Sequence, residues 1–197
     1  MYKLKRLFVW VRRMRYSRGF GVQSPYDYRF IRYVVNEHWP YYAYDELKGQ
    51  FPEVDRKTLR LCRLFLRMSN WRQAGVIIDY CPPTSAYATY MQAGCRRSRI
   101  ISVEDSCFSF QRNHIDVVEL CRMSLTGDYR IFYEQLIEHV DNHSVLVVDE
   151  INRDKVSKAF WQEVCADSRT GVTFDLYYCG IVFFNKQRYK QHYVVNF

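Results

Sequence analysis

Acidic residues stand at the ends of three apolar segments, and their types and spacing could do chemistry. The acids are Asp79, Glu104, and Asp149 followed by Glu150. In an open α/β sheet, ligands bind beyond the carboxyl ends of parallel strands. A carboxylate about 20 residues after the first strand, at the end of the second, can accept hydrogen bonds from both ribose hydroxyls. Glu104 has this place in the sequence, and an exposed acid that only ends a strand is the equally weighted alternative.

The turn after Asp79 is unusual for a nucleotide-type cofactor loop. Cys81-Pro82-Pro83-Thr84-Ser85 leads into a helical pattern, and strand, acid, tight turn and helix are how such a site begins. Glycine is common in these turns because the backbone must approach the ligand and often needs positive φ. Pro82 and Pro83 supply neither that freedom nor an amide N–H. The sequence therefore predicts the architecture of a cofactor site with altered loop chemistry.

The elements that must position these residues follow from the apolar pattern after residue 70. The predicted strands are Val76–Asp79, Ile100–Glu104, Val145–Asp149, Val172–Tyr178, Gly180–Phe184 and His192–Phe197. The predicted helices are Ser85–Ala93, Phe108–Ser124 and Lys155–Ala166. This alternation indicates an α/β fold with a Rossmann-like, mostly parallel sheet covered by helices on both faces. Residues 185–188 are typical of a hairpin, so we expect an antiparallel C-terminal strand pair.

Residues 1–70 are predicted to be a helical N-terminal extension, followed by a Rossmann-like domain over residues 71–197. Ser24 and Pro25 are a strong helix start for Tyr26–Glu37, because serine caps helices and proline suits their first turn. A further amphipathic helix fits Val54–Met68.

Within the first 18 residues, the sequence predicts a basic amphipathic helix over residues 2–16. They contain no acid and seven basic residues, namely Lys3, Lys5, Arg6, Arg12, Arg13, Arg15 and Arg18. Three interpretations stay open, in order of preference. The helix packs on its own domain or a second subunit, as in a homo-oligomer; it lies on an anionic membrane surface; or it follows a nucleic-acid backbone.

The overall composition is that of an intracellular globular protein. The chain has 197 residues and a net charge of +8, most of which belongs to the N-terminal arm. None of the seven cysteines forms a C-x-x-C pair, so we predict neither a zinc site nor a redox dithiol, and no other metal site. No secretory signal or membrane-spanning run is predicted. We expect a cytoplasmic protein, or one peripheral at the inner membrane through its basic arm.

Several segments resemble the class I S-adenosylmethionine (SAM)-dependent methyltransferase-like proteins of Bacteroidetes-type bacteria. Residues 18–26, RGFGVQSPY, are similar to a family opening of the form GFGVHSPF. Residues 173–177 and 180–184, TFDLY and GIVFF, are similar to the ending TIDLF…GLVFF. Residues 147–151, VVDEI, resemble the VxDDI segment. The match covers most of the chain from residue 18 onward.

The resemblance implies a SAM site at the strand ends. A cofactor loop of the form E-L-G-T-x-x-G falls on residues 79–85, where Asp79 keeps the acid and Cys81 and Ser85 replace glycines. The implied cofactor-binding residues are Asp79, Cys81, Ser85 and Glu104. Asp149 and Glu150 would lie on the acceptor side as a base or, less favoured because a hard cation needs further oxygen ligands, as cation ligands. The family strand that ends in DGNH is not identifiable before Val145.

Two functional hypotheses follow from this resemblance. The chain is either a SAM-dependent methyltransferase acting on an unknown substrate, or a member that keeps the fold with weakened or lost catalysis. In the second case, it would serve as a partner-binding or peripheral membrane scaffold. The prolines, the replaced glycines and the apparently shortened middle favour the second hypothesis, because a fold does not by itself imply an activity.

Overall fold

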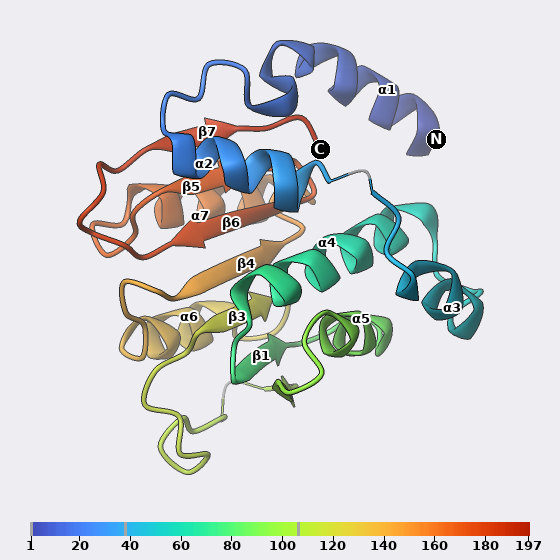
Figure 1. The fold of residues 1–197 in the computed structure, drawn as a ribbon. Helices are drawn as coiled ribbons and strands as arrows, with labels where there is room; N and C mark the ends of the chain where they lie inside the picture. Colours follow the sequence, from blue (N-terminus) through green and yellow to red (C-terminus); the bar gives the residue numbers. More distant parts are fainter. Residues whose placement is uncertain (1, 38, 106) are drawn as a thin grey trace.

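A seven-stranded sheet organises the structure, a computed structural model that describes residues 2–37, 39–105 and 107–197 (Figure 1). The strands are β1 (Val76–Tyr80), β2 (Arg99–Val103), β3 (Leu120–Met123), β4 (Val145–Asp149), β5 (Thr173–Asp175), β6 (Cys179–Phe183) and β7 (His192–Val194). Their order across the sheet is β2-β1-β3-β4-β6-β5-β7. β6 runs antiparallel to both neighbours, and the other pairings are parallel. The predicted mostly parallel sheet is therefore confirmed.

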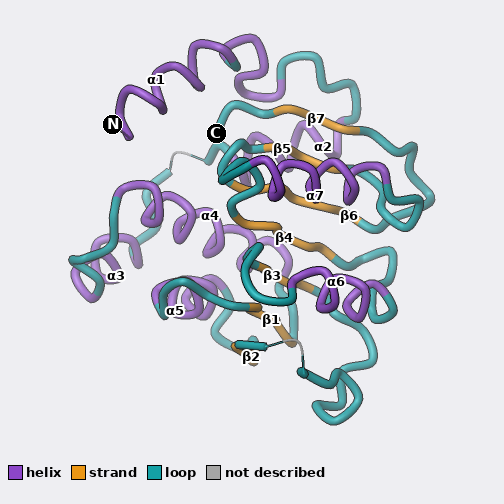
Figure 2. Tube along the Cα trace, turned by 180° about the vertical axis from the view of Figure 1, so that it is seen from behind, coloured by secondary structure: helices purple, strands orange, loops and turns teal. Residues whose placement is uncertain are grey.

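Helices cover both faces of this sheet. The face toward the viewer in Figure 1 carries α2, η2, α4 and α5, and the opposite face carries α6 and α7 (Figure 2). The front elements are α2 (Pro25–Phe30), the π-helical turn η2 (Ile31–Val35), α4 (Arg56–Arg72) and α5 (Ala86–Gly94). The rear helices are α6 (Tyr129–Ile137) and α7 (Lys155–Ala166). Beside and above them lie α3 (Ala43–Gln50), α1 (Tyr2–Arg12) and the 3-10 turn η1 (Met14–Gly19).

The strands are apolar along their length because each face of the sheet is buried under helices. Ile77 and Val147 belong to the front core, whereas Ile78 and Val148 belong to the rear core. This alternation is the period of two of a β-strand, and burial on both faces removes any need for polar positions in the central strands. Full burial of one such side chain stabilises the fold by about 1.5–3 kcal/mol.

Helix α4 is held in place by a cap and a close helix contact. The Asp55 side chain accepts a hydrogen bond from Thr58 N at 2.7 Å, which starts the helix. Gly94, at the end of α5, packs directly against the α4 backbone. A Cβ atom at this position would lie 3.0 Å from Asn70 N and still closer to the carbonyl oxygen of Leu66. The sequence therefore needs glycine here, so that α4 and α5 can share the front face.

The prediction of a helix over residues 108–124 is wrong. Turns occupy most of it, and its last residues form β3, which lies between β1 and β4. Phe110, Ile115 and Val118 are buried in the rear core and imitate the spacing of a helix face. A strand is thus present before Val145, in the region where none was predicted, although it ends at Met123 and not in an acid.

The predicted hairpin between the last two strands is also wrong. β6 is already paired on both edges, with β4 and β5, so β7 adds to the outer edge of β5 in a parallel direction. Thr173 pairs with His192 on one side and with Val182 on the other. The antiparallel C-terminal pair exists, but its members are β5 and β6.

The N-terminal helices share the core of the sheet. Phe30, Leu61 and Phe65 are buried in the same cluster as the strand residues Ile77 and Phe174. The division at residue 70 into an extension and a domain stays a prediction, and α4 continues across that position to Arg72. Helices α3 and α6 were not predicted, and the N-terminal helix ends earlier than expected, at Arg12.

Candidate functional site at the carboxyl edge of the sheet

The structure brings the predicted site residues to the same edge of the sheet. Asp79 lies in β1, and Glu104 directly follows the neighbouring strand β2. The two segments touch through Cys81, whose backbone N–H donates to Val103 O at 2.6 Å. The Cys81 thiol donates to Glu104 O at 3.1 Å. Asp149 ends β4, on the other side of β3.

These acids nevertheless face different surroundings. Asp79 is 0% exposed and Asp149 is 1% exposed, whereas Glu104 is exposed to solvent. Asp79 shares the orientation of Ile77, two residues earlier, which points into the front core. Asp149 shares the orientation of Val147 for the same reason. The two buried acids therefore point under the front helices and not outward from the rim.

Arg122 of β3 neutralises the buried acid of β1. Its Nε donates to Asp79 Oδ1, its Nη1 donates to Ser124 Oγ at 2.6 Å, and its Nη2 donates to Tyr80 O at 2.8 Å. The Arg122 side chain is 1% exposed. Burial raises the pKa of Asp79, and the charge of Arg122 opposes that rise. Asp79 Oδ2 is buried and has no hydrogen-bond partner among the described residues. The interior thus contains a buried ion pair, which costs much more to break than it adds to stability.

Tyr87 of α5 joins Asp149 to the same cluster. Its hydroxyl donates to Asp149 Oδ2 at 3.2 Å, and Glu150 N donates to Asp149 Oδ1 at 2.8 Å. The Arg122 guanidinium lies 5.3 Å from the centre of the Tyr87 ring. Burial raises the pKa values of both Tyr87 and Asp149, and Arg122 and Lys57 partly offset the rise at Asp149. Both oxygens of the Asp149 carboxylate therefore have partners inside the protein.

Glu150 is held by two cations. Lys57 Nζ, in the first turn of α4, donates to Glu150 Oε1 at 2.8 Å, and Arg153 Nη1 lies 3.4 Å from Oε2. Although partial burial opposes ionisation, Lys57 and Arg153 hold the pKa of Glu150 below its usual value. A carboxylate with these partners is a weak base near neutral pH. In the described part of the chain, no group of three His, Cys, Asp or Glu side chains could hold a metal ion.

The turn at Cys81 has the backbone conformation of a glycine-containing turn, although the residue is not glycine. Cys81 has φ +46°, in the left-handed region that glycine favours, at the position where the resemblance implies a glycine. A Cβ atom on Gly127 would lie 3.4 Å from Tyr80 Oη and 3.9 Å from Cys81 Sγ. The loop after β3 therefore packs against this turn. Ser85 lies at the start of α5, where its carbonyl accepts from Thr89 Oγ1 at 3.2 Å.

Sequence reasoning missed Arg122, Tyr87 and Lys57. Arg122 interrupts the apolar run 120–123, and a basic residue inside a buried strand is a signal for a buried acidic partner. Tyr87 looked like an ordinary core aromatic, and nothing local distinguished Lys57. Four cavities lined by described residues, with volumes between 390 and 580 Å³, do not include Asp79, Glu104 or Asp149 in their walls.

The sequence matches no family model and no curated protein. The structure, by contrast, is similar to that of the methyltransferase PaMTH1 of Podospora anserina, solved with SAH bound. The two are 10% identical, with 83% of this chain and 96% of that chain covered and a TM-score of 0.51. The fold is methyltransferase-like.

A second likeness supports this methyltransferase-like fold. MycE, a methyltransferase from the mycinamycin biosynthetic pathway solved with Mg, SAH and mycinamycin VI, has a TM-score of 0.51 and 9% identity. The likeness covers 86% of this chain and 64% of MycE, so the chain spans less than two thirds of that enzyme.

No helix of the described residues is both long and apolar enough to cross a bilayer.

Proposed function

We propose that this protein keeps the methyltransferase-like fold but has lost SAM-dependent methyl transfer. The observation that carries the proposal is Arg122, whose guanidinium is buried and donates to Asp79, Ser124 and the Tyr80 carbonyl. In an active enzyme of this architecture, the carboxyl edge is where a nucleotide-type cofactor would bind. Here the chain's own side chains bind two acids of that edge, Asp79 and Asp149, whereas Glu104 is exposed to solvent.

Charge at this edge also favours the loss of activity. SAM carries a positive sulfonium at the group that it transfers, and a binding site must place this group beside the acceptor. Arg122 and Lys57 both act on Asp149, so the acid on the expected acceptor side already has cations beside it. A further cation would be repelled there, most strongly where water is excluded.

The backbone turn supports the same conclusion. Pro82 and Pro83 provide no amide donors, and the Cys81 amide and thiol are both bonded to the β2 segment. The loop that contains Gly127 packs against the turn. Few backbone donors thus remain for a cofactor at the place where glycine-rich loops supply them.

Calorimetric titration with SAM and SAH tests the proposal. We expect no saturable heat up to millimolar ligand. Micromolar binding that weakens tenfold or more in Glu104→Ala, and is unchanged in Glu138→Ala, would overturn it. Glu138 is the matched control because it is also an exposed acid but ends α6, away from this edge. In the same experiment, circular dichroism confirms that both variants are folded.

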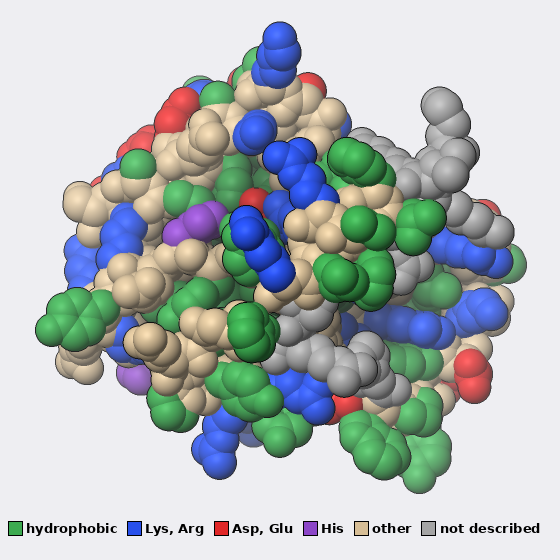
Figure 3. All heavy atoms as spheres, turned by 90° about the horizontal axis from the view of Figure 1, so that it is seen from above, with side chains coloured by type: hydrophobic (Ala, Val, Ile, Leu, Met, Phe, Trp, Pro, Cys, Tyr) green, Lys and Arg blue, Asp and Glu red, His purple; other side chains and the backbone are tan. Residues whose placement is uncertain are grey.

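A second function has an observation of its own. The apolar residues Leu7, Phe8, Trp10, Val11 and Met14, in and just after α1, are between 47% and 67% exposed. The described part of the arm is held near its C-terminal end, where Arg13 Nη1 lies 2.9 Å from Asp175 Oδ1. Asn196 also donates there to Tyr16 O at 3.2 Å and to Trp10 O at 3.4 Å. Figure 3 looks down onto this face of the molecule, where hydrophobic and basic side chains lie next to one another. Of the preferred interpretation, packing on its own domain leaves these side chains uncovered, and packing on a second subunit stays the alternative.

We therefore infer that the arm binds an anionic membrane surface as a peripheral anchor. Seven basic residues and no acid in residues 1–18 complement anionic lipid, and exposed aromatic and aliphatic side chains suit the interface. We expect flotation of the full chain with phosphatidylglycerol vesicles and its loss in Phe8→Glu. The control Ile131→Glu changes an exposed apolar residue of α6 and should float like the wild type. Equal flotation of both variants, or a homo-oligomer that Phe8→Glu dissociates without lipid, would reject the membrane anchor.

A further inference from the structure

Four arginines of α4 line a surface cavity of 390 Å³. They are Arg56, Arg60, Arg63 and Arg67, which recur at helical spacing and so share one side of α4. The rest of the wall comes from residues 35–37, at the end of η2 and just after it, from Leu59, and from Phe197, which follows β7. In Figures 1 and 2, this side of the molecule lies below α1, where the C-terminal segment meets the beginning of α4.

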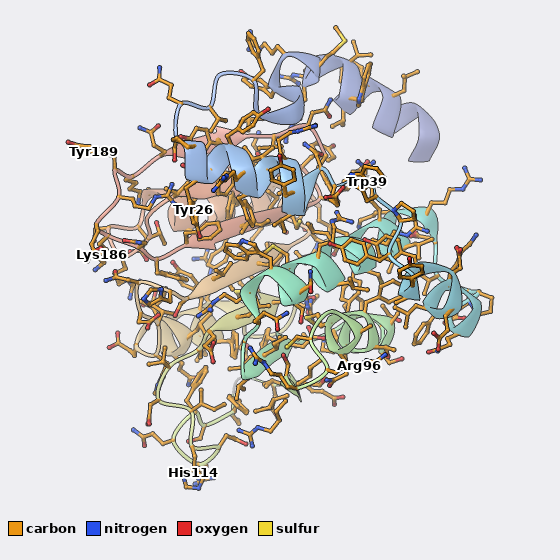
Figure 4. The ribbon with its side chains drawn as sticks, viewed as in Figure 1. Tyr26, Trp39, Arg96, His114, Lys186 and Tyr189 are labelled. Atoms are coloured by element: carbon orange, nitrogen blue, oxygen red, sulfur yellow. The ribbon has the colours of Figure 1, made fainter. Side chains whose placement is uncertain are left out.

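The cavity contains far more positive than negative side-chain charge. Glu37 is the acid among its lining side chains, and its Oε1 already accepts a hydrogen bond from Trp39 N at 2.9 Å. Figure 4 shows Trp39 in the segment that connects η2 with α3. The remaining lining side chains are neutral, and three of them are apolar, namely Val35, Leu59 and Phe197.

The arginines at the inner end of the cavity are held in place by their surroundings. Arg67, 6% exposed, donates to Val34 O at 2.6 Å, to Val35 O at 3.0 Å and to Tyr44 Oη at 3.0 Å. The Arg63 guanidinium lies 4.8 Å from the centre of the Tyr44 ring. Its Nε is buried and has no hydrogen-bond partner among the described residues. The Arg60 guanidinium lies 4.4 Å from the centre of the Phe197 ring.

We propose that this cavity binds a small phosphate-bearing anion. A guanidinium presents a planar fork of donors that matches phosphate oxygens in pairs, and a cluster held by aromatic rings loses little freedom on binding. The cavity has the size of small-molecule sites, and its apolar wall would contact the organic part of the ligand.

This inference does not rest on the proposed loss of methyl transfer, because the cavity contains none of the acids of the carboxyl edge. Lys57 of α4 points to Glu150 at 2.8 Å, whereas its neighbour Arg56 lines the cavity. The two sites therefore meet at the same end of α4 on different sides of the helix. Failure to bind SAM and failure to bind phosphate are separate results.

Calorimetry of the full chain with inorganic pyrophosphate tests the site. We expect saturable binding, weakened at least tenfold in the double variant Arg56→Gln with Arg63→Gln. Arg63→Lys keeps the charge without the fork and should weaken binding by a smaller factor. Arg96→Gln is the matched control, because Arg96 is an exposed arginine beyond α5 (Figure 4), and it should bind like the wild type. The proposal would be overturned if millimolar pyrophosphate, in tenfold excess over the protein, gave no saturable binding. Equal weakening of binding in the Arg96→Gln control would overturn it as well.

A vesicle experiment distinguishes the two sources of the phosphate group. Wild type and the double variant are sedimented with phosphatidate vesicles and with phosphatidylcholine vesicles, with and without pyrophosphate. Binding to phosphatidate that requires the arginines and is displaced by pyrophosphate identifies a lipid headgroup. Binding that is the same for both proteins and is unaffected by pyrophosphate identifies a soluble phosphate compound as the ligand of the cavity.

Discussion

Arg122 and the arginines of α4 place the same side chain in two opposite settings. Arg122 lies inside the sheet, where an acid, a hydroxyl and a carbonyl accept from its guanidinium. The cavity beside α4 collects four arginines with one lining acid. At the edge of the sheet where a ligand is expected, Asp79 and Asp149 thus have partners inside the protein, whereas a surface that no motif marks collects positive charge. Ligand capacity depends on where folding gathers charge at an accessible surface, and not on which positions the fold usually employs.

The largest expected effect comes from breaking the buried ion pair. Arg122→Met leaves Asp79 buried and charged, so we expect a loss of about 3–5 kcal/mol in the free energy of unfolding. Urea unfolding measures the loss. The double variant Asp79→Leu with Arg122→Met should recover most of it, because an apolar pair replaces the ions. A loss below about 1 kcal/mol in the single variant would mean that Arg122 is not the essential partner of Asp79.

The second effect concerns the element that the two regions share. Gly94→Ala places a methyl group against the α4 backbone, and such overpacking costs about 1–3 kcal/mol. Because α4 carries both Lys57 and the cavity arginines, pyrophosphate binding should weaken as well. Gly49→Ala is the control, since a Cβ atom there meets nothing within 4 Å and alanine favours α3 by roughly 0.5–1 kcal/mol. Thermal unfolding compares the two, and similar melting temperatures would contradict the close contact.

A smaller effect is expected at the turn after β1. Cys81→Gly removes the left-handed strain at φ +46°, which is worth about 1–2 kcal/mol, at the expense of the thiol hydrogen bond to Glu104 O. We expect a net gain in stability of about 1 kcal/mol or less. SAM should still not bind, because Arg122 remains in place. Micromolar SAM affinity in this variant would show that the turn alone had closed the site.

The smallest effect contrasts most directly with Arg122. Arg56→Gln removes an exposed cation from the first turn of α4, where the helix dipole disfavours positive charge by about 0.3–1 kcal/mol. Repulsion between Arg56 and Arg60, four residues later, destabilises the helix by roughly a further 0.2–0.5 kcal/mol. We therefore expect slightly higher stability with weaker pyrophosphate binding. A clear loss of stability in urea would show that Arg56 has a structural role.

Most strand and helix positions could be predicted because their signals are local. β1, β4 and α7 coincide with the predicted segments to within a residue or so, since continuous apolar runs and a helix cap are visible in short windows. β3 failed because it has four residues, one of them charged. The pairing of β7 failed because it depends on the occupied edges of β6, which only the complete sheet defines.

The sequence by itself determined that acids end the strands and that the loop after β1 lacks glycine, since both are matters of residue order. It also determined the concentration of basic charge before residue 19. Only the tertiary structure decided what those acids do, because Asp79 and Arg122 are 43 residues apart in the chain. Whether a charge is free to bind a ligand depends on the partners that folding brings to it and on the water that folding removes, and neither can be read from residue order.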